Sequence, residues 1–157
     1  MSATTTARAE IHAAIALAIR DGIMRALAVA GLAAVALIHL LDTPGAFREQ
    51  PYKGWLYLAL IVGSLVTARA LLSGSDSLAW VAATLLPLGA LAAFVISRTA
   101  GLPGGGDDIG NWSEPLGLAS LFVEGSLITL GASVIASRMS AGRVSLVRRP
   151  ALDVVTP

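Results

Sequence analysis

The sequence predicts an all-α integral membrane protein, an up-down bundle of four transmembrane helices preceded by a short amphipathic helix. Two observations lead to this fold class. Hydrophobic residues make up 55% of the chain and charged residues only 13%, which is about half the charged fraction of an ordinary soluble domain. The apolar residues are also gathered into long runs. This composition excludes a soluble globular domain, a disordered chain and a nucleic-acid-binding protein, and it makes 1–157 a single membrane domain.

Four apolar segments are long enough to cross a bilayer as helices. About 20 mostly apolar residues cover roughly 30 Å of hydrocarbon, and this length is reached by residues 22–41, 54–72, 78–97 and 116–136. The shorter connections are rich in Gly, Pro, Ser and Asp, which end helices and form turns. Short connections make consecutive helices antiparallel neighbours. The runs lack the alternation of a transmembrane β-strand, so helices are favoured over a barrel.

The segment before the first span, residues 7–21, mixes apolar and charged residues. Its isoleucines recur every four residues from Ile11 to Ile19, which places them on one helix face. This pattern predicts a short amphipathic helix on the membrane surface. A straight continuation into the first span would be longer than the bilayer is thick, so a bend is expected near Asp21 and Gly22.

The basic residues predict which way the bundle faces. Four spans place both termini on one side, and of the 11 Lys and Arg residues all but three lie there, the three being Arg48, Lys53 and Arg98. Because positively charged flanks stay cytoplasmic, both termini are predicted to be cytoplasmic, and residues 42–53 and 98–115 to face outward. Residues 137–157 are then a basic cytoplasmic tail. This tail either contacts anionic headgroups or only enforces the topology.

Glu124 is an acidic residue inside the fourth span, about 12 Å below the outer surface at 1.5 Å per residue. A charge at the bilayer centre costs about 2.5–3.5 kcal/mol on insertion scales, so this side chain should face the bundle interior and be paired or protonated. Ser64 and the Ala83 carbonyl that Pro87 leaves free are expected partners. The side chain is either a functional site or a protonated, hydrogen-bonded packing residue.

A cluster of polar residues is expected above Glu124, at the outer ends of the spans. Its members are His39, Asp42, Arg98 and Glu114. His39 is the histidine placed to titrate near neutral pH at this mouth, as a proton carrier or ligand, or else it is an interface residue. One histidine without Met or Cys is too few soft ligands for copper or haem. No metal and no cofactor is therefore predicted.

The longest outward segment is acidic and rich in glycine. Asp107, Asp108 and Glu114 crowd three carboxylates into it. Such oxygens suit a hard cation, but their spacing is not that of an EF-hand, so the segment is either a cation site or a solvated acidic loop. Ser113 or Glu114 can cap the fourth helix, with Pro115 in its first turn.

Small residues recur every four positions in three of the spans, which places each set on one helix face. The sets are Ala26, Ala30 and Ala34, then Ala59, Gly63 and Thr67, and finally Gly125, Thr129 and Ser133. Such faces let backbones approach closely, either inside the bundle or against another protein. The predicted partners are therefore the lipid bilayer and, through these faces, a membrane protein or a second copy of the chain, and not nucleic acid.

The segment from Ser97 to Glu124 resembles one carried by a group of uncharacterised small four-span membrane proteins, mainly actinobacterial. Their segment reads S-R-T-x-G-L-P, a Gly/Asp run, I-G-N-W-x-E-P-L-G and a later acid. The matching positions here are Ser97, Arg98, Thr99, Gly101, Leu102, Pro103, Ile109, Gly110, Asn111, Trp112, Glu114, Pro115, Leu116, Gly117 and Glu124. The resemblance brings no activity with it. It suggests a bacterial plasma membrane and draws attention to the Arg98–Glu124 region.

Two functional hypotheses remain open at this stage. The first is a non-enzymatic accessory or structural subunit of a membrane complex, because the sequence assembles no catalytic set on one side of the membrane. The second is a proton-coupled carrier or channel for a small solute that uses Glu124, with Arg98 and His39 at its mouth. A membrane enzyme has no specific support.

Overall fold

A computed structural model describes the backbone of residues 2–74 and 77–147, and the side chains of residues 5–74, 77–106 and 108–141. The described chain is helical, with no strand element. Four long helices are joined by short links and one 3-10 turn. In order they are α1 (Ser2–Glu49), α2 (Pro51–Leu72), α3 (Ser77–Thr99), η1 (Gly106–Asp108) and α4 (Pro115–Val147). The predicted all-α class is confirmed.

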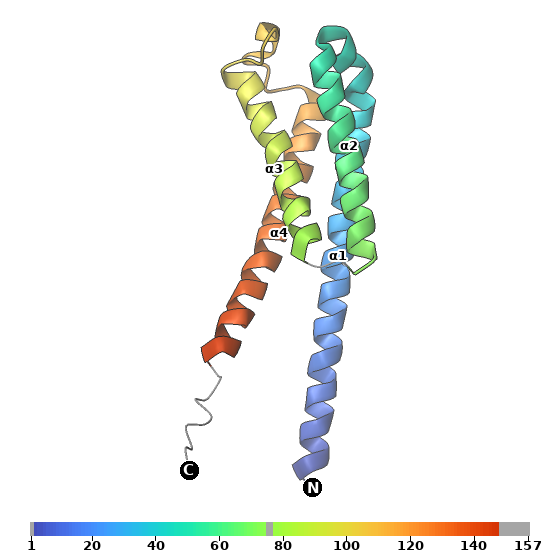
Figure 1. The fold of residues 1–157 in the computed structure, drawn as a ribbon, viewed down its shortest axis with the longest axis vertical. Coiled ribbons are helices and arrows are strands. Elements are labelled where there is room, and N and C mark those ends of the chain that lie inside the picture. The colour runs from blue at the N-terminus through green and yellow to red at the C-terminus, as the bar shows by residue number, and fades with distance from the viewer. Residues whose placement is uncertain (1, 75–76, 148–157) are drawn as a thin grey trace, which may run out of the picture.

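The four helices run alternately up and down, so the start of α1 and the end of α4 lie at the same end of the bundle (Figure 1). Each helix contains a stretch that is long and apolar enough to cross a membrane, with mean hydropathy between 1.8 and 2.1. These stretches contain the four predicted spans. The composition and length of the helices therefore indicate a multi-pass membrane protein.

The predicted extent of the turn at residues 42–53 is wrong, because α1 continues to Glu49 with Pro44 inside it. The chain turns instead at Gln50, whose backbone is extended, with φ −150° and ψ 104°. A residue before proline is pushed toward extended conformations, and Pro51 suits the first position of a helix. Both prolines offered a break, and the chain takes the later one, so α1 and α2 form a hairpin with a one-residue link.

The expected bend near Asp21 and Gly22 is absent, since α1 passes through both residues without interruption. Residues 7–21 are helical, as predicted, but they belong to α1 rather than to a separate helix. One reason is local: Asp21 forms an ion pair of 2.7 Å with Arg25 one turn later, across the expected break. Every side chain from 5 to 23 is exposed. We call this part of α1 the N-terminal arm.

The predicted tail is also partly helical, because α4 extends to Val147. Residues 148–157 lie outside the described part of the chain. Where the helix leaves the bundle, Arg138 lies 5.9 Å from the Trp80 ring centre and 3.6 Å from Asp21. The first turns of the expected tail thus dock on α1 and α3.

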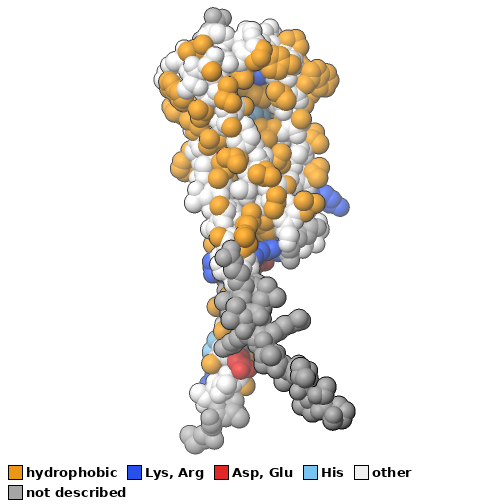
Figure 2. All heavy atoms as spheres, turned by 60° about the vertical axis from the view of Figure 1, so that its left-hand side comes forward, with side chains coloured by type: hydrophobic (Ala, Val, Ile, Leu, Met, Phe, Trp, Pro, Cys, Tyr) orange, Lys and Arg blue, Asp and Glu red, His pale blue; other side chains and the backbone are white. Residues whose placement is uncertain are grey.

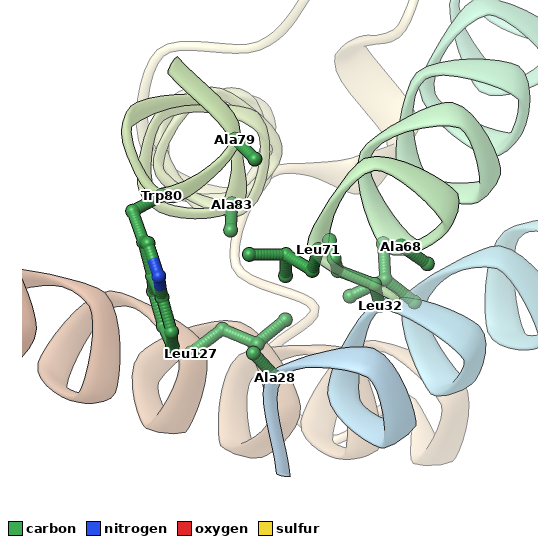
Figure 3. Packing of buried hydrophobic residues seen from close by; sticks show 9 residues of the cluster. Ala28, Leu32, Ala68, Leu71, Ala79, Trp80, Ala83 and Leu127 are labelled. Atoms are coloured by element: carbon green, nitrogen blue, oxygen red, sulfur yellow. The ribbon is translucent and has the colours of Figure 1, made fainter. Parts of the chain in front are cut away.

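A packed apolar cluster joins the four helices in the half of the bundle that is nearer the termini. It combines small and large residues of all four helices: Ala28, Leu32, Val35, Ala68, Leu71, Ala79, Trp80, Ala83 and Leu127. Figure 3 shows Trp80 reaching from α3 to α4. Small residues allow this approach, and a Cβ added at Gly31 of α1 would lie 2.7 Å from Leu127 of α4. Close packing of this kind drives helix association in lipid.

Charged residues border the apolar part of the bundle at both ends. At the terminal end, Arg25 donates to the Leu71 carbonyl at 3.0 Å, at the C-terminus of α2. At the other end, Asp42 of α1 begins the polar region. The helix rises about 25 Å from Arg25 to Asp42, which is close to the roughly 30 Å of a hydrocarbon core.

Candidate functional site

A cavity of about 560 Å³ lies between the helices, at the end of the bundle away from the termini. The face in Figure 2 is hollowed near its upper end, where basic and histidine side chains are visible among apolar ones. The cavity is lined by all five residues that the sequence placed at the outer mouth and below it: Glu124, Arg98, His39, Glu114 and Asp42. The structure therefore brings the predicted cluster together. Asp108 also lines the cavity, whereas the side chain of Asp107 lies outside the described part of the chain.

Helices α1, α2 and α4 contribute polar side chains three or four residues apart, so that those of one helix share one face. His39 and Asp42 are three residues apart on α1, and Ser120 precedes Glu124 by one turn on α4. Sequence reasoning missed further lining residues, namely Glu49, Lys53, Tyr57, Asn111 and Ser120. The signal for two of them was the four-residue spacing of Lys53 and Tyr57, both on α2.

Glu124 forms the floor of the cavity. It is 1% exposed, and its Oε1 accepts a hydrogen bond of 2.7 Å from the Ser120 hydroxyl of the same helix. Its Oε2 is buried and has no partner among the described residues. A buried carboxylate oxygen without a partner is costly, so this atom is prepared to receive a proton or a donor group.

His39 faces Glu124 across the floor. Its Nδ1 lies 2.9 Å from the Val35 carbonyl, which can only accept, so Nδ1 carries the hydrogen. Its Nε2 lies 3.9 Å from Glu124 Oε1. The Tyr57 ring packs against the imidazole edge-on, with ring centres 4.8 Å apart, and fixes its orientation. Nε2 and the carboxyl are therefore two proton-binding groups that face one another.

The expected partners of Glu124 are not found. Ser64 is buried, but its hydroxyl has no partner in the described part of the molecule, and Ser120 is the hydroxyl that reaches Glu124. Pro87 is buried inside α3 without ending the helix. Both side chains face inward, but they lie at different levels. Tyr57 is the α2 residue beside His39, and Ser64 follows it by seven residues, about two helical turns nearer the terminal end.

Arg98 organises the rim above the floor. It is 7% exposed and pairs with Asp108 Oδ1 and, at 3.3 Å, with Glu114 Oε2. Its guanidinium also lies 4.9 Å from the centre of the Phe94 ring. Glu114 in turn accepts a 3.1 Å hydrogen bond from the Gly117 N–H, so it caps α4, as the sequence predicted. Arg98 thus fastens the loop after α3 to the start of α4.

Lys53 closes the other side of the rim. Its ammonium lies 3.1 Å from Glu49 and 3.4 Å from Asp108. Partial burial opposes ionisation of Asp108, but the hydrogen bond from Arg98 and the charge of Lys53 outweigh it, so the pKa of Asp108 lies below its ordinary value. The acidic loop is therefore ion-paired rather than simply solvated. The described side chains also contain no group of three or more His, Asp or Glu that could hold a metal ion.

The small-residue faces divide between the interior and the surface. Thr67 is buried, whereas Ala26, Ala30, Thr129 and Ser133 are exposed. A shallow surface groove runs along α4 past Gly125, Thr129 and Ser133. These exposed positions do not pack within the described monomer, which leaves the prediction of a protein partner at these faces open.

Comparison with known proteins adds no relative. No protein-family model, curated protein or solved structure matches the chain. The resemblance of the Ser97–Glu124 segment to small four-span membrane proteins stays a prediction, and the functional argument rests on the cavity.

Proposed function

We propose that the protein is a plasma-membrane carrier that binds a small solute in this cavity from the outer side and exchanges it for a proton at Glu124. The observation that carries the proposal is the floor of the cavity. Glu124 is buried with one oxygen unpartnered, and it faces the free Nε2 of His39. Ionisable groups inside membrane segments typically mark ion and proton pathways.

The cavity favours a carrier over an open channel. The members of the packed cluster, such as Leu32, Leu71 and Leu127, all lie on the terminal side of the floor. These three leucines are 3% exposed or less. Solute that reaches Glu124 from the outer end therefore meets close packing beyond it, and passage requires the helices to move.

The orientation belongs to the same proposal. Most Lys and Arg residues lie at the terminal end of the bundle, and basic flanks stay cytoplasmic. Both termini are then cytoplasmic, and the rim formed by Arg98 and Lys53 faces outward. In this outward-open arrangement, Glu124 would exchange its proton with the outer medium when the solute binds or leaves.

A second candidate function has one observation in its favour. The exposed small-residue face of α4, with Gly125, Thr129 and Ser133, suits close packing against another helix. An accessory subunit of a membrane complex would use this face. Co-purification from mild detergent tests it, and a monodisperse particle that holds only this chain would count against it.

Proton exchange at Glu124 is tested by infrared difference spectroscopy of the protein in vesicles while the outer pH is changed. We expect a carboxyl signal that appears and disappears with outer pH and is lost in Glu124→Gln. Glu10→Gln is the matched control, because Glu10 is exposed on the N-terminal arm, and it should leave the signal unchanged. A signal that persists in Glu124→Gln, or that responds only to the inner pH, would overturn the proposal.

A further inference from the structure

We propose that the solute is a lipophilic amine, an organic cation with an apolar body that enters the cavity from the outer leaflet between α2 and α3. This inference rests on the proposed function and adds the chemical class of the solute and its route. It follows from the charge balance of the cavity, the nature of its walls and the side on which it opens.

The charge balance of the cavity favours a cationic solute. Its described lining holds two permanent cations, Lys53 and Arg98, and five carboxylates: Asp42, Glu49, Asp108, Glu114 and Glu124. Both cations are engaged by the three rim carboxylates.

The carboxylates of Asp42 and Glu124 therefore have no permanent cation near them. Asp42 accepts a hydrogen bond of 3.2 Å from Tyr57, and Glu124 is contacted by the Ser120 hydroxyl and faces the imidazole of His39. A positive charge at this place would be attracted by both carboxylates and an anion would be repelled. One bound ammonium group takes the place of one proton, so the exchange leaves the total charge of the cavity unchanged.

The walls around this charged floor are mostly apolar. Leu60, Leu86, Phe94 and Leu116 contribute to them. A volume of about 560 Å³ is within the range of sites for drug-sized organic molecules and far exceeds a bare ion. The Tyr57 ring beside His39 adds an aromatic face of the kind that attracts organic cations. The site therefore fits an ammonium group attached to a hydrocarbon body.

The cavity opens sideways between α2 and α3. These helices approach closely at Gly63, where an added Cβ would lie 3.2 Å from Leu86, and they lie further apart toward the outer end (Figure 1). Leu56 lies above that point and Leu85 beside it; both line the cavity and are still 60% and 57% exposed. Exposed leucines at this level face hydrocarbon in a membrane. An amphiphile dissolved in the outer leaflet can therefore enter without crossing the ion-paired rim.

The test compares three probes that share one carbon skeleton: 4-phenylbutylamine, 4-phenylbutanol and 4-phenylbutanoate. Binding to the full chain in detergent is measured by calorimetry at several pH values. We expect the amine to bind at least tenfold more tightly than the alcohol, and the carboxylate not to bind. Amine affinity should fall as the pH is lowered, because protons compete at the floor, and it should drop at least tenfold in Glu124→Gln.

A second pair of variants tests the route without touching the floor. Ala93→Phe places a ring at the opening, since Ala93 lines the cavity and is exposed, whereas Ala92 is exposed but does not line it. In vesicles, Ala93→Phe should slow amine association at least tenfold and Ala92→Phe should not, while the infrared carboxyl signal of Glu124 persists in both.

Three results would overturn the inference. They are equal binding of all three probes, amine binding unchanged in Glu124→Gln, and equal association rates in the two alanine variants. If the amine fails to bind but the Glu124 carboxyl still responds to outer pH, the solute class is wrong and the proton exchange stands. If that carboxyl does not respond, the proposed function itself fails.

Discussion

Replacing Arg98 with leucine is expected to lower the free energy of unfolding by about 3–5 kcal/mol, the usual cost of removing one partner of a buried ion pair. Arg98 is 7% exposed and pairs with Asp108 and Glu114. Without its guanidinium, both carboxylates stay at the rim of an apolar site with one cation, Lys53, beside Asp108. The loop after α3 should then separate from the start of α4, which is measurable as lower thermal stability and faster proteolysis of the loop.

The same ion pairs predict how the stability of the outer end depends on pH. The folded-state pKa of Asp108 lies below its ordinary value of 3.8, so its stabilising contribution is complete above that value and is lost as the pH falls through the folded-state pKa. This loss on acidification should be reduced in Arg98→Leu. Arg98→Lys keeps a charge but not the fork of donors. Its loss of stability on acidification should therefore lie between that of the unmodified protein and that of Arg98→Leu. Arg69→Ala, at an exposed position, should cost about 0.5 kcal/mol or less. A similarly small cost for Arg98→Leu would contradict the role of Arg98.

Replacing Trp80 with alanine is expected to have an effect of similar size, about 3–5 kcal/mol. Trp80 is 1% exposed and fills the space between α3 and α4 (Figure 3). Its removal leaves a cavity that the neighbouring helices can close only in part. Denaturation of the purified protein in mixed detergent measures the loss.

Two controls separate packing from other effects at Trp80. The indole N–H has no partner in the described part of the chain, so Trp80→Phe should cost much less than Trp80→Ala. Phe122→Ala removes a ring that is 78% exposed and should cost little, because that ring faces lipid in the proposed orientation. Equal losses at Trp80 and Phe122 would mean that the cluster is not the core of the bundle.

The helices were predictable from the sequence because each crossing demands an unbroken apolar run of fixed length. Their ends were less predictable. Pro44 and Pro51 carry nearly the same local signal, yet the chain turns only before the second. The bend expected at Gly22 is also absent. The helical backbone hydrogen bonds continue through this position, and no proline interrupts them there.

The candidate site was predictable as a cluster but not in its pairing. Consecutive spans alternate in direction, and this alone places His39, Arg98 and Glu114 at one end of the bundle. The contact of Glu124 with Ser120 instead of Ser64 depends on the level at which each residue of α2 passes α4, which no local pattern fixes. The contacts of Lys53 depend on where α1 ends, and the predicted end of that helix was wrong.

The central claim is that the chain crosses the membrane four times, with its N-terminal and C-terminal ends on the same side. The chain contains no cysteine, so single cysteines report their own location without background labelling. Thr5→Cys, Ser73→Cys and Ser140→Cys should react with an impermeant thiol reagent only after the inner side is opened. Arg48→Cys and Gly106→Cys should react in intact cells. Labelling of residues 5 and 140 from opposite sides, or of all five positions in intact cells, would contradict the account.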